Sequence, residues 1–298
     1  MFVVTGATGR TGTAVVEGLL KAGREVRAVG RSASRLREET PAAQPFVAEP
    51  TDRDALARAF AGAEGVYAMV QPNYIPDSDD FPGHQRRIVE AISGALGDAR
   101  VARVVTLSSW GAGKPDGTGP VAGLHHLEQA VNRLGVATTH LRAGYFMENL
   151  LGQVPAILDR GVMAAPFGPD VPMPFVTAPD IGYAAAETLL EPGPAGDGPE
   201  IREIQGERDL SMSDVVRVVA RLAGRPELRY VQQPIEEFAA DQRAAGVSEN
   251  VTALMVEVAH AINSGHTRAL QPRTARTSTP TSIEQFVTSV MLPALGQS

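Results

Sequence analysis

The sequence of 298 residues contains no cysteine. A chain without thiols forms no disulfide bond, carries no thiolate nucleophile and offers no cysteine ligand to a metal. Three classes of protein are therefore excluded: disulfide-stabilised secreted domains, cysteine-dependent enzymes and thiolate-bound metalloproteins.

The chain also lacks an excess of positive charge and a long apolar run. Its formal net charge is −7, which gives no electrostatic basis for binding nucleic acid or an anionic membrane surface. No apolar run is long enough to span a bilayer. A core strand begins directly at Phe2, which leaves no room for a signal peptide. We therefore expect a cytoplasmic protein with no membrane partner and no metal site.

The first twelve residues predict a nucleotide-binding turn. A short apolar run, Phe2-Val3-Val4, is followed by glycines in the spacing G-x-x-G-x-x-G and then by a helical stripe of apolar residues. Such glycines let the backbone turn tightly and approach phosphates, while free N–H groups at the helix start face the negative charge. We expect dinucleotide contacts from Gly6, Thr8, Gly9, Arg10, Thr11 and Gly12.

No acidic residue follows the second predicted strand, which covers 25–29. A fold that prefers NAD usually places an acid there, about 20 residues beyond the glycines, to bind the ribose hydroxyls. This chain has Arg31 and Ser32, with Arg35 one helical turn further on. A basic residue here suits the 2′-phosphate of NADP, so NADP(H) is the preferred cofactor and NAD(H) the alternative. Alternatively, these arginines are solvated or support the adenine ring.

Strands and helices alternate through the first half of the chain. Further strands are predicted over 44–48, 65–70, 103–107 and 136–141, separated by helices. This pattern indicates an α/β fold with a doubly wound parallel sheet. We expect an NAD(P)-binding Rossmann domain over 1–150. Residues 151–298 are expected to form mainly a smaller α/β substrate lobe, with some segments returning to the sheet. Residues 152–176, rich in proline and glycine, are predicted to run irregularly over it.

The ends of parallel strands border the ligand crevice of such folds. We expect further cofactor contacts there from Val70, Gln71, Ser108, Gly144 and Tyr145. Substrate contacts are predicted for Trp110, Phe146, Met147, Asn149 and Phe175. The alternative for Trp110, Phe146 and Met147 is plain core packing, whereas Phe175 is expected to contribute to a substrate lid.

Together these motifs resemble the NmrA-like group of atypical short-chain dehydrogenase/reductases. The resemblance rests on the glycine turn, Arg31, Leu107-Ser108-Ser109, the stretch from Thr139 to Leu150 with Phe146-Met147-Glu148-Asn149, and Pro179-Asp180-Ile181. It covers almost the whole chain. It implies a large Rossmann domain, NAD(P) in the crevice and a pocket between the two lobes.

The chain lacks the proton-donating Tyr-x-x-x-Lys pair of catalytic relatives. Judged by Glu128, which follows it, the pair would fall on Val121 and His125. Hydride transfer to a ketone produces a strongly basic alkoxide, so a positioned acid matters. Transfer to a quinone produces a phenolate-like anion whose conjugate acid has a pKa of about 10, and needs less help. The missing tyrosine therefore disfavours simple ketone reduction.

We accordingly predict an NAD(P)H-dependent oxidoreductase that transfers hydride to a quinone or polycyclic aromatic substrate. The resemblance and a composition rich in alanine, arginine and glycine point to polyketide tailoring as its pathway. His125 and Ser109 are the residues expected to assist the substrate oxygen, and the alternative for His125 is a surface or half-buried helix histidine. The competing functions are a non-catalytic NADP(H) redox sensor and an isoflavone-reductase-like double-bond reductase. A partner protein that consumes the reduced aromatic is compatible with this chemistry, and no signal fixes an oligomeric state.

Overall fold

A seven-stranded sheet forms the centre of the computed structural model, which describes residues 1–70, 76–194 and 198–296. The strand order is β10-β6-β5-β4-β1-β2-β3, and every pairing in it is parallel. The order reverses between β1 and β4, where α/β sheets open a crevice for ligands. The predicted doubly wound sheet is confirmed. Its strands are β1 (Phe2–Thr5), β2 (Val26–Gly30), β3 (Gln44–Val47), β4 (Gly65–Met69), β5 (Arg103–Ser109), β6 (Ala137–Ala143) and β10 (Glu200–Ile204).

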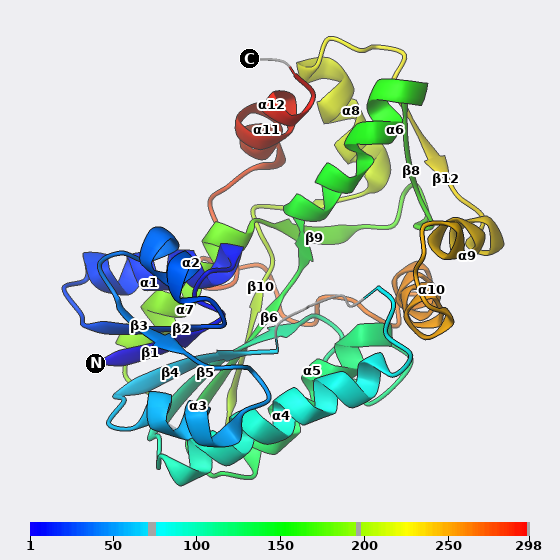
Figure 1. Cartoon of the computed structure of the whole chain (residues 1–298). Coiled ribbons are helices and arrows are strands. Elements are labelled where there is room, and N and C mark those ends of the chain that lie inside the picture. The colour runs from blue at the N-terminus through cyan, green and yellow to red at the C-terminus, as the bar shows by residue number, and fades with distance from the viewer. Residues whose placement is uncertain (71–75, 195–197, 297–298) are drawn as a thin grey trace.

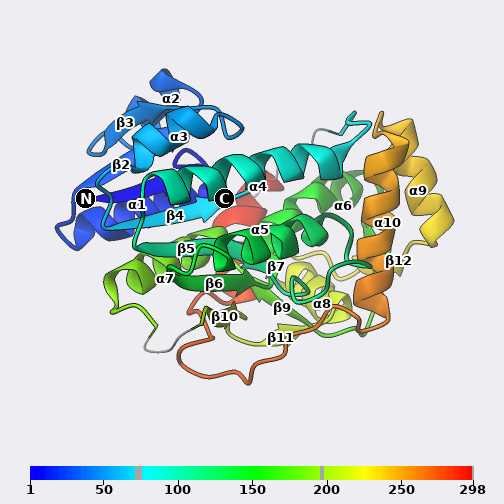
Figure 2. The same cartoon turned by 90° about the horizontal axis from the view of Figure 1, so that it is seen from below.

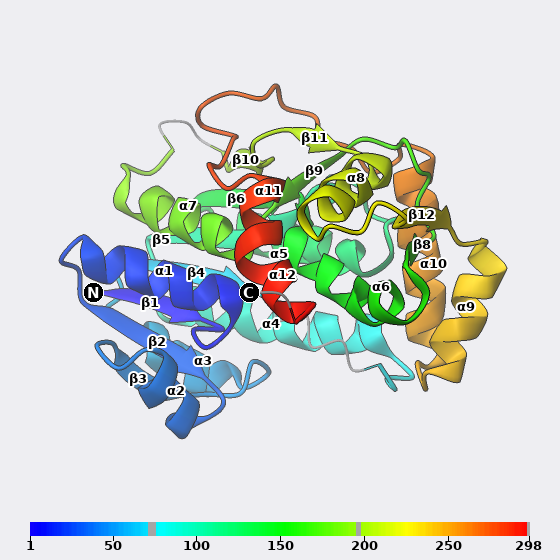
Figure 3. The same ribbon diagram turned by 90° about the horizontal axis from the view of Figure 1, so that it is seen from above.

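Helices cover both faces of this sheet. Side chains alternate along each strand, so Val4 and Val3 of β1 belong to two different apolar clusters. Figure 3 shows α1 and α7 on one face, and Figure 2 shows α4 and α5 lying across the other. The first face carries α1 (Arg10–Lys21), α2 (Ala33–Glu39) and α7 (Ala178–Leu190), and the second carries α3 (Arg53–Phe60), α4 (Phe81–Asp98) and α5 (Ala122–Asn132).

Helices α1 and α7 pack closely because glycines face the contact. A Cβ on Gly182 would stand 2.5 Å from the carbonyl oxygen of Thr11, and one on Gly18 would stand 2.7 Å from the Cβ of Ala186. Residue numbers rise in the same direction along both helices, so they run parallel. The N-terminus of α7 therefore lies level with the glycine turn that precedes α1.

The C-terminal part of the chain builds a smaller α/β lobe, which stands above the sheet in Figure 1. One three-stranded sheet, one two-stranded sheet and several helices enclose an apolar cluster that includes Met163, Phe167 and Phe286. The lobe consists of β7 (Tyr145–Phe146), η2 (Met147–Gln153), α6 (Val154–Arg160), β8 (Val162–Ala165), β9 (Met173–Val176), β11 (Asp209–Leu210), α8 (Met212–Leu222), β12 (Arg229–Gln232), α9 (Ile235–Ala244), α10 (Glu249–Asn263), α11 (Ile283–Phe286), η3 (Val287–Met291) and α12 (Leu292–Ala294).

The prediction that 152–176 is irregular is wrong, because this segment contains α6, β8 and β9. Two of its prolines and glycines mark the ends of α6. Pro155 occupies the first turn of α6, where a missing N–H costs nothing, and Gly161 ends that helix with a left-handed φ of 63°. None of the helices in the described part of the chain combines the length and apolarity needed to cross a bilayer.

Candidate functional site

The turn between β1 and α1 has the backbone geometry of a phosphate cradle. Gly6 has a left-handed φ of 61°, and its carbonyl accepts the N–H of Gly9 at 2.9 Å. A Cβ on Gly12 would overlap the Gly6 carbonyl and stand 2.8 Å from its carbon, so only glycine lets α1 start this close to the turn. The helix has no side-chain cap and no acid in its first turn. Its N-terminal N–H groups are thus left for an anionic ligand.

A cavity of about 270 Å³ opens beside this turn. Among the described residues that line it are two arginines and no carboxylate, so the cavity favours an anion. Gly6, Thr8, Gly9, Arg31 and Arg35, all predicted to contact the cofactor, lie around it. The full lining is Thr5, Gly6, Thr8, Gly9, Val29, Gly30, Arg31, Arg35, Ala48, Pro50, Leu56 and Met69.

The basic residues after β2 are organised by helix α2. Ser32 is the N-cap of α2, and its hydroxyl accepts the N–H of Arg35 at 3.3 Å. The Arg35 guanidinium donates to the carbonyl of Thr8 at 3.1 Å and so connects α2 to the glycine turn. Arg31 is exposed at the mouth of the cavity. Ser32 is therefore a structural cap, while Arg31 and Arg35 line the cavity.

The other cofactor residues predicted in and beyond the turn have mainly structural contacts here. Thr11 is buried, with its hydroxyl 3.9 Å from the sulfur of Met69. Val70 is buried in the cluster under α3, α4 and α5, and Gln71 lies outside the described residues. Gly144 is explained by packing, because a Cβ there would overlap the carbonyl oxygen of Pro174.

A buried ion pair lies behind the end of β5, and sequence reasoning missed it. Arg142 on β6 donates to both oxygens of Glu128 on α5, at 2.9 and 2.6 Å, and this pairing raises the pKa of Arg142. The Ser108 hydroxyl donates to the same carboxylate at 2.6 Å. The Ser108 side chain is therefore engaged in this network, and its contact with the cofactor stays a prediction. The available signals were an arginine inside a predicted strand and a glutamate on an otherwise apolar helix face.

His125 and Ser109 are connected through one turn of backbone. The carbonyl of Ser109 accepts the N–H of Ala112 at 3.0 Å, and the carbonyl of Ala112 lies 2.9 Å from Nδ1 of His125. Both side chains are half-buried. A bond to a carbonyl requires the hydrogen on Nδ1, so Nε2 of a neutral His125 is an acceptor, and only the imidazolium donates from Nε2.

The large apolar residues predicted to contact the substrate lie together in the structure, mostly inside the core. Trp110, Met147 and Phe175 are at most 6% exposed and belong to the cluster of the C-terminal lobe. The Tyr145 ring packs edge-on against Phe175, with centroids 5.2 Å apart. This burial favours the core-packing alternative for these side chains. Of the remaining predicted substrate residues, Phe146 is half-buried and Asn149 is exposed.

Glu148 is a second charged residue near the turn that the prediction did not include. It follows Met147 in η2, and its Oε1 accepts the N–H of Ala178, the first residue of α7, at 2.9 Å. Its Oε2 is buried without a hydrogen-bond partner among the described residues. The signal in the sequence was a carboxylate in the apolar stretch 145–151.

Helix α10 contacts the described residues that lead into α4 and α5. The side chain of Asn250 accepts the N–H of Phe81 at 2.9 Å, at the start of α4, and the hydroxyl of Ser248 donates to the carbonyl of Ser78 at 2.5 Å. Gly119, in the short helix η1 (Gly119–Val121) before α5, lies so close to α10 that a Cβ would overlap the carbonyl oxygen of Leu254. The lobe thus positions the border of the crevice.

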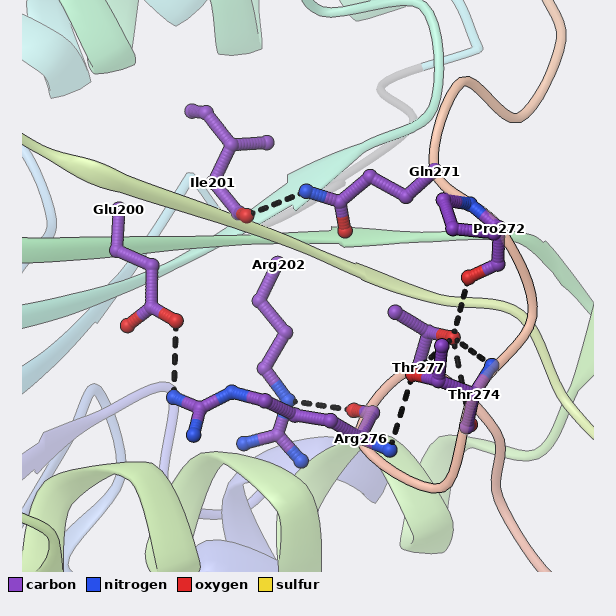
Figure 4. A pocket seen from close by; sticks show the side chains of 8 residues that line it. All are labelled: Glu200, Ile201, Arg202, Gln271, Pro272, Thr274, Arg276 and Thr277. Atoms are coloured by element: carbon purple, nitrogen blue, oxygen red, sulfur yellow. Dashed lines mark hydrogen bonds and ion pairs between the residues drawn. The ribbon is translucent and has the colours of Figure 1, made fainter.

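A second cavity, of about 250 Å³, lies at the opposite edge of the sheet, between β10 and residues 271–277 (Figure 4). Its charged side chains are engaged with one another. Arg276 pairs with Glu191 at 3.0 Å and with Glu200 at 2.8 Å, while Arg202 donates to the hydroxyl of Thr188 at 2.9 Å. These contacts hold the segment over the edge strand and assign it a structural role.

Comparisons with known proteins agree with this geometry. The chain is 28% identical over 260 residues to an NAD(P)H azoreductase of Xenophilus azovorans, covering 87% of this chain and 86% of that protein. It is 29% identical over 237 residues to (4-alkanoyl-5-oxo-2,5-dihydrofuran-3-yl)methyl phosphate reductase of Streptomyces griseus, covering 79% and 78%. A crystal structure of the NADPH-dependent quinone oxidoreductase of Escherichia coli, complexed with NADPH, superposes with a TM-score of 0.82 at 21% identity, covering 98% of this chain and all of that one.

The model of the NmrA-like family matches residues 1–287. This match extends from the glycine turn through the C-terminal lobe and ends in η3. The chain therefore belongs to the NmrA-like family.

Proposed function

We propose that this chain is an NADP(H)-dependent oxidoreductase that transfers hydride to a quinone or a related conjugated aromatic acceptor. The observation that carries the proposal is the cavity beside the glycine turn, lined by Arg31 and Arg35 and by no described carboxylate. Two arginines in a lining that contains no described carboxylate suit a cofactor that bears a 2′-phosphate.

The residues present fit such a cofactor. The uncapped start of α1 would hold the pyrophosphate on its N–H groups, and Gly12 keeps that start within reach of the turn. Arg31 and Arg35 would bind the 2′-phosphate, and Ala48, Pro50 and Leu56 add apolar surface for the adenine. When bound, NADPH supplies the hydride.

The class of acceptor is inferred from the proton donors that the chain can place beside the product anion. Val121 replaces the tyrosine of relatives and brings no acid. A quinone product resembles a phenolate, with a conjugate acid of pKa about 10, and tolerates this loss better than an alkoxide does. The named relatives support a conjugated acceptor: one is an azoreductase, one reduces a dihydrofuranone and one structural neighbour is a quinone oxidoreductase.

His125 is the side chain available to assist the substrate oxygen. Its bond to the carbonyl of Ala112 orients the ring and reserves Nδ1. An imidazolium at this position donates from Nε2, whereas the neutral ring only accepts there. We expect a His125→Gln variant to retain NADPH binding and to lose turnover with quinones by about tenfold. This loss is smaller than the roughly 10²–10⁴-fold of general acid assistance because the phenolate-like product needs less help. Unchanged turnover would remove His125 from the reaction.

A panel of acceptors tests the substrate class. NADPH oxidation by the purified chain is measured with a quinone, an azo dye, a conjugated lactone and a saturated ketone. We expect the quinone to be reduced fastest and the ketone to be inert. Faster reduction of the lactone would favour a double-bond reductase. NADPH binding without oxidation by any acceptor would favour a redox sensor instead.

A further inference from the structure

Glu148 lies at the same level of the fold as the glycine turn. Its Oε1 accepts the N–H of Ala178 at 2.9 Å, at the first residue of α7. One helical turn later, Gly182 packs against the carbonyl of Thr11 in the first turn of α1. Because α1 and α7 run parallel, the Glu148 carboxyl group stands beside the end of α1 that is left for an anionic ligand.

The second oxygen of this carboxyl group lacks a partner. Oε2 is buried, and no described residue donates to it. Buried polar atoms are rarely left in this state, and an ionised carboxylate only accepts hydrogen bonds. A proton on Oε2 would turn the atom into a donor and reduce the cost of burying a charge.

Two charged residues act on Glu148, one from each helix beside it. Burial raises the pKa of Glu148. The backbone N–H groups of Ala178 and of Glu148 itself and the positive charge of Arg10 oppose this rise, and Asp180 adds to it. Asp180 already accepts two bonds from Thr281, from the N–H at 3.1 Å and the hydroxyl at 2.9 Å. Arg10 is exposed and forms no ion pair within the described ranges of the chain. Arg10 is thus the cation that favours ionised Glu148, and it remains available to a ligand.

A pyrophosphate at the start of α1 would reverse this balance. Its negative charge would attract Arg10, and the same charge would repel an ionised Glu148 across a partly buried site. We propose that Glu148 belongs to the cofactor site and takes up a proton from solvent when NADP(H) occupies the glycine turn, an inference that rests on the cofactor proposed above. Glu148 then holds its proton at Oε2 while Oε1 keeps its bond to α7.

Calorimetry measures this proton directly. NADPH is titrated into the full chain near pH ~6 in two buffers of different ionisation enthalpy, and the difference in heat gives the protons taken up per cofactor bound. We expect Glu148→Gln, which mimics the protonated form and keeps an acceptor for Ala178, to take up fewer protons than the wild type. The affinity of Glu148→Gln for NADPH should also change less with pH than the affinity of the wild type does. The 2′-phosphate titrates in the same range but contributes equally to both proteins.

Two controls complete the test. Glu17→Gln removes an exposed carboxylate of α1 that pairs with Lys21, and it should leave the proton uptake at the wild-type value. The wild type is also titrated with NADH, which has no 2′-phosphate. Proton uptake in this titration must come from a group of the protein, and this control needs no variant. Equal uptake by wild type and Glu148→Gln, with NADPH bound by both, would overturn this inference alone. Absence of NADPH binding by the wild type would overturn the proposed function and this inference with it.

Discussion

The carbonyl of Gly6 occupies the space that a side chain on Gly12 would need, because a Cβ there would stand 2.8 Å from the carbonyl carbon. Gly12→Ala therefore forces the start of α1 away from the turn and displaces the N–H groups that would hold the pyrophosphate. We expect NADPH affinity to fall by more than about tenfold, or ~1.4 kcal/mol, as measured by fluorescence titration.

Gly152→Ala is the matched control for this change. Gly152 lies in η2, and a Cβ there would meet no heavy atom within 4 Å. This variant should bind NADPH as the wild type does. Wild-type affinity in a folded Gly12→Ala protein would contradict the assignment of the turn as the cofactor site.

Arg31 is expected to set the preference for NADP(H) over NAD(H). Its guanidinium lines the cavity, and a charge-assisted hydrogen bond to a phosphate is worth about 1.5–3 kcal/mol. Arg31→Ala should therefore weaken NADPH binding about 10- to 100-fold while NADH binding changes little. Arg37→Ala removes an exposed arginine from the last turn of the neighbouring helix α2 and should change neither affinity. Equal losses for both cofactors in Arg31→Ala would show that Arg31 does not read the 2′-phosphate.

The Glu128–Arg142 pair is predicted to be a stability determinant. The two side chains are only 2% and 13% exposed, and breaking a buried pair leaves an uncompensated charge that costs about 3–5 kcal/mol. Glu128→Ala should lower the free energy of unfolding, measured in urea, by roughly 3 kcal/mol. The exposed Arg53–Asp98 pair serves for comparison, since Asp98→Ala should cost less than about 1 kcal/mol. Similar small losses at both sites would contradict this account.

His140 is expected to make stability fall in mild acid. It is fully buried between the hydroxyl of Thr106 at 2.7 Å and the side-chain oxygen of Asn132 at 2.9 Å, and burial lowers its pKa to about 4. The unfolded chain binds this proton near pH ~6.5, so the stabilisation is complete above that pH and is lost as the pH falls toward the folded value.

Between pH ~7.5 and ~5 this single group should cost roughly 2 kcal/mol of unfolding free energy. Urea unfolding at the two pH values tests the prediction, with His140→Gln expected to lack that part of the pH dependence. His126→Gln, which changes an exposed histidine of α5, should keep it. Identical slopes for wild type and His140→Gln would contradict the assignment.

The elements that depend on local pattern were predictable from the sequence. The glycine turn, the apolar strand at 65–69 and the capping pair of Ser211 and Asp214 are encoded within a few residues of one another, and the structure contains each of them. Gly23 likewise ends α1 with a φ of 72°, as a helix-stopping glycine does. Short-range chemistry decides these features, so a single sequence is sufficient to read them.

The contacts that define the site depend on distant parts of the chain. Glu128, Ser108 and Arg142 meet only because α5, β5 and β6 pack together. The sequence around Gly144 predicts a cofactor residue. Its packing against Pro174, thirty residues later in the chain, depends on the tertiary structure. The burial of Trp110 likewise depends on the C-terminal lobe, whose packing cannot be predicted from a local sequence pattern.

The central claim is that this chain passes hydride from NADPH to a quinone. The most direct measurement is the loss of NADPH absorbance by the purified protein with and without a quinone, repeated with NADH. We expect quinone-dependent oxidation that is much faster with NADPH than with NADH. NADPH that binds tightly but is not oxidised faster when quinone is added would contradict it.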